Sequence, residues 1–281
     1  MSVKKKHFLI TLFNLKLWDS DKGNIATCTD LWMQKRFALF EEYCLPSVSQ
    51  QTTSNFTWLC LLDEDTSQVY KERLESYRKQ VPQLTPCYFN SEQTKEWKAH
   101  VKDIVSSLLD DEDYVITTNL DNDDSISKYL LEDIQNEVDK RQQTGLYTYV
   151  DGLQYFPHLK LLLKMHYPHN HFLTYVEDAH SDFKTTIFIR HAEARKKMQN
   201  IIDIKGKPYW MEVVHSNNVT NELRITSRIQ YKLIWRNFDL QEYGLNIQLS
   251  SSNNRAVNLT KFPLYFIKIG YKKLLRKIRR G

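Results

Sequence analysis

Apolar and amphipathic segments alternate along the first half of the chain. Residues 7–13 and 56–62 are nearly continuous apolar runs, and residues 114–120 form a third that is rich in β-branched side chains. Runs of this length predict buried strands. Apolar residues three to four apart predict a helix from Leu31, with Asp30 as N-cap and an end near Pro46. A second helix is predicted over 67–80.

This order predicts an α/β fold, with a mostly parallel central sheet flanked by helices. The second half is less regular. Strands are predicted over 145–150, 185–190 and 208–215, whereas the apolar, aromatic segment 155–165 has no clear assignment.

Composition places the chain among globular proteins. It has 281 residues, of which 41% are apolar and 12% aromatic. Its four cysteines are far apart and form no CxxC pair, so neither a disulfide framework nor a zinc site is expected. Reduced thiols in a cytosolic setting are expected instead. No run reaches the ~18 apolar residues of a membrane span. Lys4–Lys6 before an apolar run mimics a secretion signal, but polar residues interrupt that run and a strand is expected there.

A short acidic segment carries most of the chemical information. Asp121-Asn122-Asp123-Asp124 directly follows the strand predicted over 114–120, at the sheet edge where α/β proteins bind ligands. Carboxylates two residues apart can hold Mn²⁺ or Mg²⁺ and leave coordination positions for the oxygens of a diphosphate. The segment is therefore a candidate DxD motif of a nucleotide-sugar-dependent glycosyltransferase.

Three other interpretations compete. A capping turn is the simplest, but a helix cap does not need three acids. A calcium loop fits the spacing, yet it would place Ile126 where the loop needs glycine. A phosphatase of the haloacid dehalogenase type would use Asp121 as its nucleophile, but its further motifs are not evident. The alternative to an enzyme is a membrane-associated protein that binds glycan or nucleotide without turnover.

Several separated motifs resemble one family. The chain is similar to a bacterial rhamnosyltransferase family with a GT-A-type fold, over roughly residues 7–225, through Arg36–Phe40, Tyr43–Val48, Gln50–Thr52, Phe56–Leu59, Asp121–Asp124 and Trp210–Asn218. Two positions depart from the family's pattern. Leu12 stands where its first strand usually has an arginine, and Asn119 stands where an arginine usually precedes the acidic motif. The resemblance implies a catalytic domain over 1–245, with a nucleotide-sugar half over about 1–125 and an acceptor half over about 126–245. Residues 246–281 form an extension.

Sugar transfer needs a stabilised diphosphate and a base for the acceptor hydroxyl. Asp121 and Asp123 are the predicted ligands of Mn²⁺ or Mg²⁺. The resemblance, and its place at a strand end, add His215 as a third. The residues expected to contact the donor are Asn14, Asp63, Asn119, Asp121, Asp123 and Asp124. The candidate general bases are Glu177 and Asp178, followed by Asp151. An inverting reaction is expected.

The carboxyl-terminal segment is basic and amphipathic. Residues 261–281 carry eight Lys and Arg and no acid; removing these eight charges from the net charge of +5 leaves −3 for the rest. At helical spacing, one arc of about 100° holds Leu264, Ile267, Tyr271, Leu274, Leu275 and Ile278. This pattern predicts an in-plane helix on an anionic membrane, and disfavours nucleic acid as the partner. The alternative is a helix that packs on the domain or on a second subunit. We therefore expect a peripheral enzyme at the inner face of the bacterial cytoplasmic membrane, acting on a surface glycan whose acceptor is lipid-linked.

Overall fold

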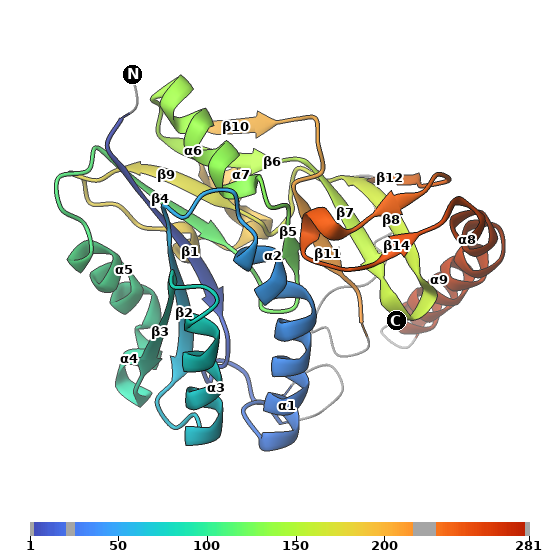
Figure 1. Cartoon of the computed structure of the whole chain (residues 1–281), viewed down its shortest axis with the longest axis horizontal. Helices are drawn as coiled ribbons and strands as arrows, with labels where there is room; N and C mark the ends of the chain where they lie inside the picture. Colours follow the sequence, from blue (N-terminus) through green and yellow to red (C-terminus); the bar gives the residue numbers. More distant parts are fainter. Residues whose placement is uncertain (1–2, 21–25, 216–228, 279–281) are drawn as a thin grey trace.

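A seven-stranded mixed sheet forms the centre of the computed structural model, which describes residues 3–20, 26–215 and 229–278, the last seven of these as backbone only (Figure 1). Its strand order is β10-β6-β9-β4-β1-β2-β3. The four strands at one end run parallel: β1 (Lys5–Leu12), β2 (Thr57–Asp63), β3 (Leu84–Phe89) and β4 (Tyr114–Asn119). β9 (Thr174–Asp178) is antiparallel to both of its neighbours, β4 and β6 (Gly145–Tyr149), and β10 (Ile201–Ile204) pairs parallel with β6. The predicted α/β class is confirmed.

A second sheet lies beside the first. Its order is β12-β8-β7-β11-β5, with β12 (Gln230–Leu233), β8 (Leu161–His166), β7 (Asp151–Phe156), β11 (Trp210–Val213) and β5 (Ser125–Ile126). β5 begins directly after the acidic segment and pairs antiparallel with β11. A two-stranded sheet joins β13 (Phe238–Asp239) to β14 (Gln248–Leu249).

Helices cover both faces of the parallel strands because side chains alternate along them. One face of the sheet packs against α1 (Asp30–Leu39), α3 (Gln68–Arg78) and α6 (Leu130–Arg141) through Leu9, Trp58 and Cys60. The other face packs against α5 (Trp97–Ser107) through Phe8, Ile10 and Leu59. The remaining α-helices are α2 (Leu45–Ser49), α4 (Ser91–Lys95), α7 (His191–Lys197), α8 (Ser251–Ala256) and α9 (Phe262–Ile278). Figure 1 shows α9 at the end of the molecule formed by β7, β8 and α8.

Several sequence predictions need correction. Thr29, not Asp30, is the N-cap of α1. The helical stretch continues past Pro46 to Ser49, through a π-helical turn at Phe40–Cys44, since Pro46 lies in the first turn of α2, where its missing N–H costs little. Residues 185–190 contain a 3₁₀ turn, Thr186–Phe188, instead of a strand.

Other elements were not foreseen. Segment 155–165 contributes to the hairpin of β7 and β8, and β3 with α4 and α5 fills the interval between the predicted helix at 67–80 and β4. The predicted helix at the carboxyl-terminal end is present as α9.

Gly152 lies under the indole of Trp210. A Cβ added there would be 2.2 Å from the indole Cδ2 atom, and the indole Nε1 donates to the Tyr149 carbonyl at 2.6 Å. Both sides of this contact are buried, so a methyl group has no space to occupy.

We predict that Gly152→Ala lowers the free energy of unfolding by about 1–3 kcal/mol, because it overpacks a filled core. Urea unfolding measures the change. Gly270→Ala on α9 is the matched control, since no atom lies within 4 Å of a Cβ there, and it should be neutral or slightly stabilising. Equal stability of Gly152→Ala and wild type would contradict the prediction.

Candidate active site

Polar residues follow the carboxyl ends of three adjacent parallel strands. β1 lies between β2 and β4, so Asn14, Asp63 and the acidic segment 121–124 come to the same edge of the sheet. Backbone hydrogen bonds carry the pairing to this edge: the Phe13 N–H donates to the Leu61 carbonyl, and the Leu120 N–H donates to the Ile10 carbonyl, both at 3.0 Å. This is the position at which open α/β sheets bind their ligands.

The acidic segment is a tight turn with three unlike carboxylates. The Asp124 N–H donates to the Asp121 carbonyl at 3.3 Å, and the Asn122 amide donates to the Phe13 carbonyl at 3.2 Å. The Asp121 side chain is 59% exposed, whereas those of Asp123 and Asp124 are buried. The turn therefore presents one carboxylate to solvent and directs two into the protein.

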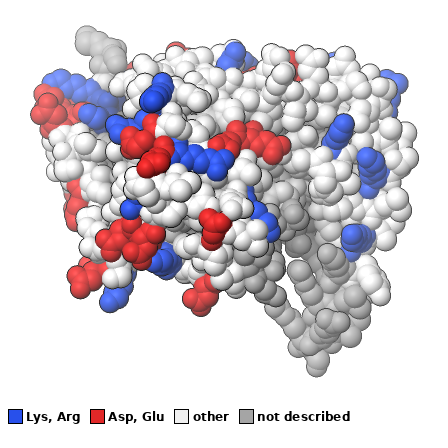
Figure 2. Space-filling view, turned by 60° about the horizontal axis from the view of Figure 1, so that its bottom comes forward, with Lys and Arg blue, Asp and Glu red and all other residues white. Residues whose placement is uncertain are grey.

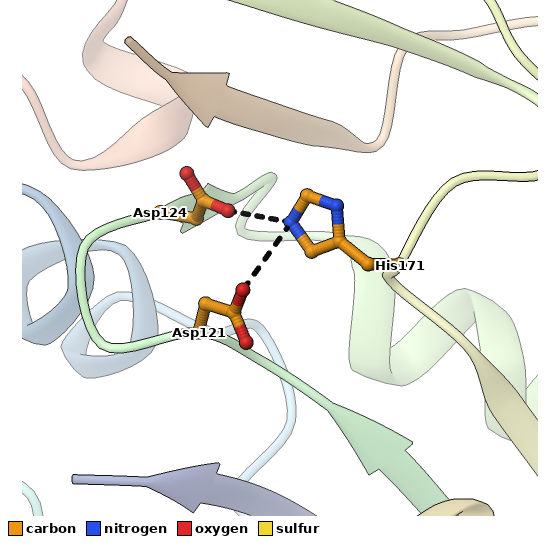
Figure 3. Close-up of side chains that lie close together, drawn as sticks. All are labelled: Asp121, Asp124 and His171. Atoms are coloured by element: carbon orange, nitrogen blue, oxygen red, sulfur yellow. Dashed lines mark hydrogen bonds and ion pairs between the residues drawn. The ribbon is translucent and has the colours of Figure 1, made fainter. Parts of the chain in front are cut away.

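Asp121, Asp124 and His171 form one cluster, in which both carboxylates approach the same ring nitrogen (Figure 3). His171 Nε2 lies 2.6 Å from an oxygen of Asp124 and 3.7 Å from one of Asp121. The other oxygen of Asp124 accepts the Val213 N–H at 2.7 Å. His171 reaches the cluster because it precedes β9, whose antiparallel pairing with β4 brings the start of β9 to the carboxyl end of β4.

Burial and charge shift the proton affinities in this cluster. Burial raises the pKa of Asp124 to about 8, although the hydrogen bond to His171 opposes the shift. Burial lowers the pKa of His171, but the hydrogen bond to Asp124 and the charge of Asp121 outweigh it and raise the pKa to about 9. The cluster therefore holds a proton near neutral pH, which a cation bound there would displace.

Asp123 belongs to a second cluster. Its Oδ2 accepts a hydrogen bond from Arg36 Nη1 at 2.9 Å and lies 3.0 Å from His215 Nε2. The same guanidinium nitrogen donates to the Asn122 side-chain oxygen at 3.2 Å. Burial alone raises the pKa of Asp123, but His215 and Arg36 together lower it below its usual value. This carboxylate is therefore an anion compensated from both sides.

Both clusters offer ligand atoms that suit Mn²⁺ or Mg²⁺. The three ligand atoms of Asp121, Asp124 and His171 lie within 4.8 Å of one another. Carboxylate oxygen suits both ions, and imidazole nitrogen suits transition metals. The predicted partners Asp123 and His215 are likewise brought together, but among the described residues Asp121 joins a three-ligand group with Asp124 and His171 and not with this pair.

A hollow of about 210 Å³ lies beside Asn14 and Asp63. Asn14 Nδ2 donates to Thr66 Oγ1 at 3.0 Å, and Asp63 Oδ1 lies 3.0 Å from Lys16 Nζ. Tyr70 contributes to the wall. An acid, an amide, an ammonium group and an aromatic ring can together recognise a small polar ligand. Asn119, at the end of β4, instead accepts a hydrogen bond from the Thr186 hydroxyl at 2.9 Å.

The candidate general bases lie elsewhere. β9 pairs Glu177 with Val115 and Asp178 with Tyr114, so both acids are at the amino end of β4, at the edge opposite Asp121. Glu177 accepts the backbone N–H groups of Lys184 and Thr185, each at 2.7 Å.

Asp151 begins β7, at the end of that strand away from Val213, and lies 2.8 Å from His166 Nδ1. It also accepts the Gly206 N–H at 2.9 Å. Each of these carboxylates therefore has local hydrogen-bond partners, and none of the three joins the clusters around Asp121 through a contact that the structure records.

Two residues at the site were not singled out from the sequence. His171 lies in an irregular segment, and only the pairing of β9 with β4 reveals its position. Arg36 was noted within a family motif but was given no role. An arginine on the otherwise apolar face of a predicted helix is the signal that could have indicated a buried partner.

Comparison with known proteins identifies the family. The sequence model described as "Putative rhamnosyl transferase" matches residues 21–227. Two solved structures are similar, both of S. aureus TarS residues 1–349, one of them in complex with UDP. Each is 14% identical to this chain and covers 74% of it, with TM-scores of 0.43 and 0.42, and the chain spans 60% of the TarS chains. No curated protein matches.

The match to the family model extends over most of the 281 residues and includes both the acidic segment and His215. The chain therefore belongs to the family that this model describes as putative rhamnosyl transferases.

Proposed function

We propose that this protein is a glycosyltransferase that takes its sugar from a nucleotide-sugar donor and depends on Mn²⁺ or Mg²⁺. The observation that carries the proposal is the position of Asp121, the exposed carboxylate at the end of the central strand β4. It forms a cluster with Asp124 and His171, and it shares its sheet edge with the hollow at Asn14 and Asp63.

The proposed binding mode places the nucleoside in that hollow. Asp63 and Asn14 offer hydrogen-bond partners to a base, while Lys16 adds a positive charge. The diphosphate then extends along the edge of the sheet towards Asp121. Asp124 either orients donor hydroxyls or joins Asp121 and His171 as a ligand. Asn119 and Asp123 complete the set of proposed donor contacts.

The bound divalent cation would stabilise negative charge on the leaving diphosphate. Asp121 belongs to both possible ligand sets, the one with Asp123 and His215 and the one with Asp124 and His171. In either set, the side chains hold the cation where the donor phosphates arrive. The acceptor hydroxyl would attack the anomeric carbon on the face opposite the diphosphate. The bond from that carbon to the diphosphate oxygen breaks, the hydroxyl proton passes to a base, and the configuration inverts. We propose a bacterial surface glycan as acceptor, carried on lipid at the inner face of the cytoplasmic membrane.

Replacing Asp121 tests the donor site. We predict that Asp121→Asn weakens Mn²⁺ binding, measured by calorimetry, by at least about tenfold, since one charged ligand is lost. Mn²⁺-dependent hydrolysis across a panel of nucleotide sugars should fall to background. Because Asp121 is exposed, the variant should keep the melting temperature of the wild type.

Asp103→Asn, an exposed acid on α5, is the matched control and should change neither readout. Comparing Asp123→Asn and His215→Gln with Asp124→Asn and His171→Gln assigns the remaining ligands. Failure of the wild type to bind any nucleotide sugar, together with a metal-dependent phosphatase activity that Asp121→Asn removes, would contradict the proposal and favour the phosphatase.

The buried carboxylate of Glu177 provides a second test. Its two backbone hydrogen bonds favour a structural role, even though the sequence suggested a base. We predict that Glu177→Gln lowers the free energy of unfolding by about 1–3 kcal/mol, because one charged acceptor is lost. The kcat of the folded variant should stay near that of the wild type. Unchanged stability with kcat reduced a hundredfold or more would instead identify Glu177 as the base, and Asp151→Asn is the parallel measurement for the other candidate.

A further inference from the structure

Helix α9 has two apolar faces along residues 262–271, and among the described residues only one of them packs on the protein. Phe262, Tyr265 and Ile269 face inward and join the cluster around Phe156 and Leu163. The rings of Tyr265 and Phe156 meet edge to face, with centroids 5.3 Å apart. Ile269 is buried. These contacts fix the helix to β7 and β8.

The second apolar face is exposed. Leu264, Ile267 and Tyr271 are 69%, 65% and 60% exposed, and their spacing of three and four residues places them along one side of the helix. In sequence, Leu274, Leu275 and Ile278 continue the same periodicity. The described members of the amphipathic stripe predicted from the sequence are therefore not the residues that hold the helix to its own domain. A row of large exposed apolar side chains is typical of an interaction surface.

The charge around this face has one sign. Residues 251–281 contain no acid, and two lysines are exposed here, Lys261 directly before α9 and Lys268 on α9. Burial, followed by the charges of Lys268 and Lys261, lowers the pKa of nearby His158. In Figure 2, the right-hand end of the visible face carries scattered Lys and Arg, whereas the acidic groups gather towards the other end. The surface therefore suits an anionic partner.

From these observations we propose that the outward face of α9, centred on Leu264, Ile267 and Tyr271, docks on a membrane that contains anionic phospholipid. The helix lies in the plane of the interface, with the apolar row among the acyl chains and the lysines at the headgroups. Among the described residues, no helix has both the length and the apolarity to cross a bilayer. A membrane fits better than a nucleic acid because the most exposed side chains of this face are apolar. Anionic headgroups also match the positive charge of the lysines, which an apolar protein partner would not need.

Vesicle sedimentation with the full-length protein tests the docking face. Binding is expected to phosphatidylcholine vesicles that contain phosphatidylglycerol and not to pure phosphatidylcholine, and it should weaken as NaCl rises. Leu264→Ser with Ile267→Ser should reduce the partition coefficient by at least about tenfold, because two large apolar side chains are lost from the interface. Val69→Ser with Leu108→Ser removes two exposed apolar side chains from the other half of the chain, and it should bind like the wild type.

The melting temperature of each variant, together with hydrolysis of a nucleotide sugar in solution, separates docking from folding and catalysis. The α9 variant should keep both while losing the vesicles. The proposal would be overturned by no binding to anionic vesicles at low salt, by equal binding of the two double variants, or by a dimer in solution that the α9 variant converts to monomer without any lipid binding. RNA binding in place of lipid binding would do the same. None of these outcomes depends on whether the donor site functions as proposed.

Discussion

The buried ion pair between Arg36 and Asp123 joins the parts of the protein from which the site is built. Arg36 comes from α1, Asp123 from the turn after β4, and His215, on the other side of the same carboxylate, follows β11 of the second sheet. Leaving one partner of such a pair buried alone costs about 3–5 kcal/mol. The pair therefore fixes the backbone of the acidic segment, and with it the direction of Asp121.

Compensation of charge allows four consecutive residues to include three carboxylates. Asp121 is exposed, Asp123 is paired with a guanidinium group and an imidazole, and Asp124 shares a proton with His171. The Val213 N–H adds a further donor to Asp124. Without these partners, like charges at such short spacing would repel each other in a buried turn. The arrangement leaves Asp121 as the carboxylate of this segment that solvent and ligands can reach.

Much of this site could be predicted from sequence because it follows local pattern. The apolar runs at β1, β2 and β4 are long enough to be recognised as strands from the sequence alone. Polar residues directly after neighbouring parallel strands then lie at the same edge of the sheet. That reasoning located Asn14, Asp63 and Asp121 correctly in the fold, while their roles stay predictions.

The rest depends on tertiary pairing that no local pattern encodes. β9 enters the sheet antiparallel between β4 and β6, which brings His171 to the site and carries Glu177 to the opposite edge. Residues 185–190 have the composition of a strand, yet Thr185 has a positive φ of 67°, and its N–H is bonded to Glu177. The packing of the Trp210 indole against Gly152 also joins two strands far apart in the sequence, and no local pattern indicates it.

The inward face of α9 packs into the same buried cluster as Val214. Ile269 and Val214 belong to the same buried cluster, and Val214 is the residue before His215. The carboxyl-terminal helix and the end of β11 at the site thus share a small core. A shortened chain that ends before Ile269 would lose part of that core as well as the basic segment. Truncation therefore confounds anchoring with catalysis, whereas substitutions confined to the outward face separate them.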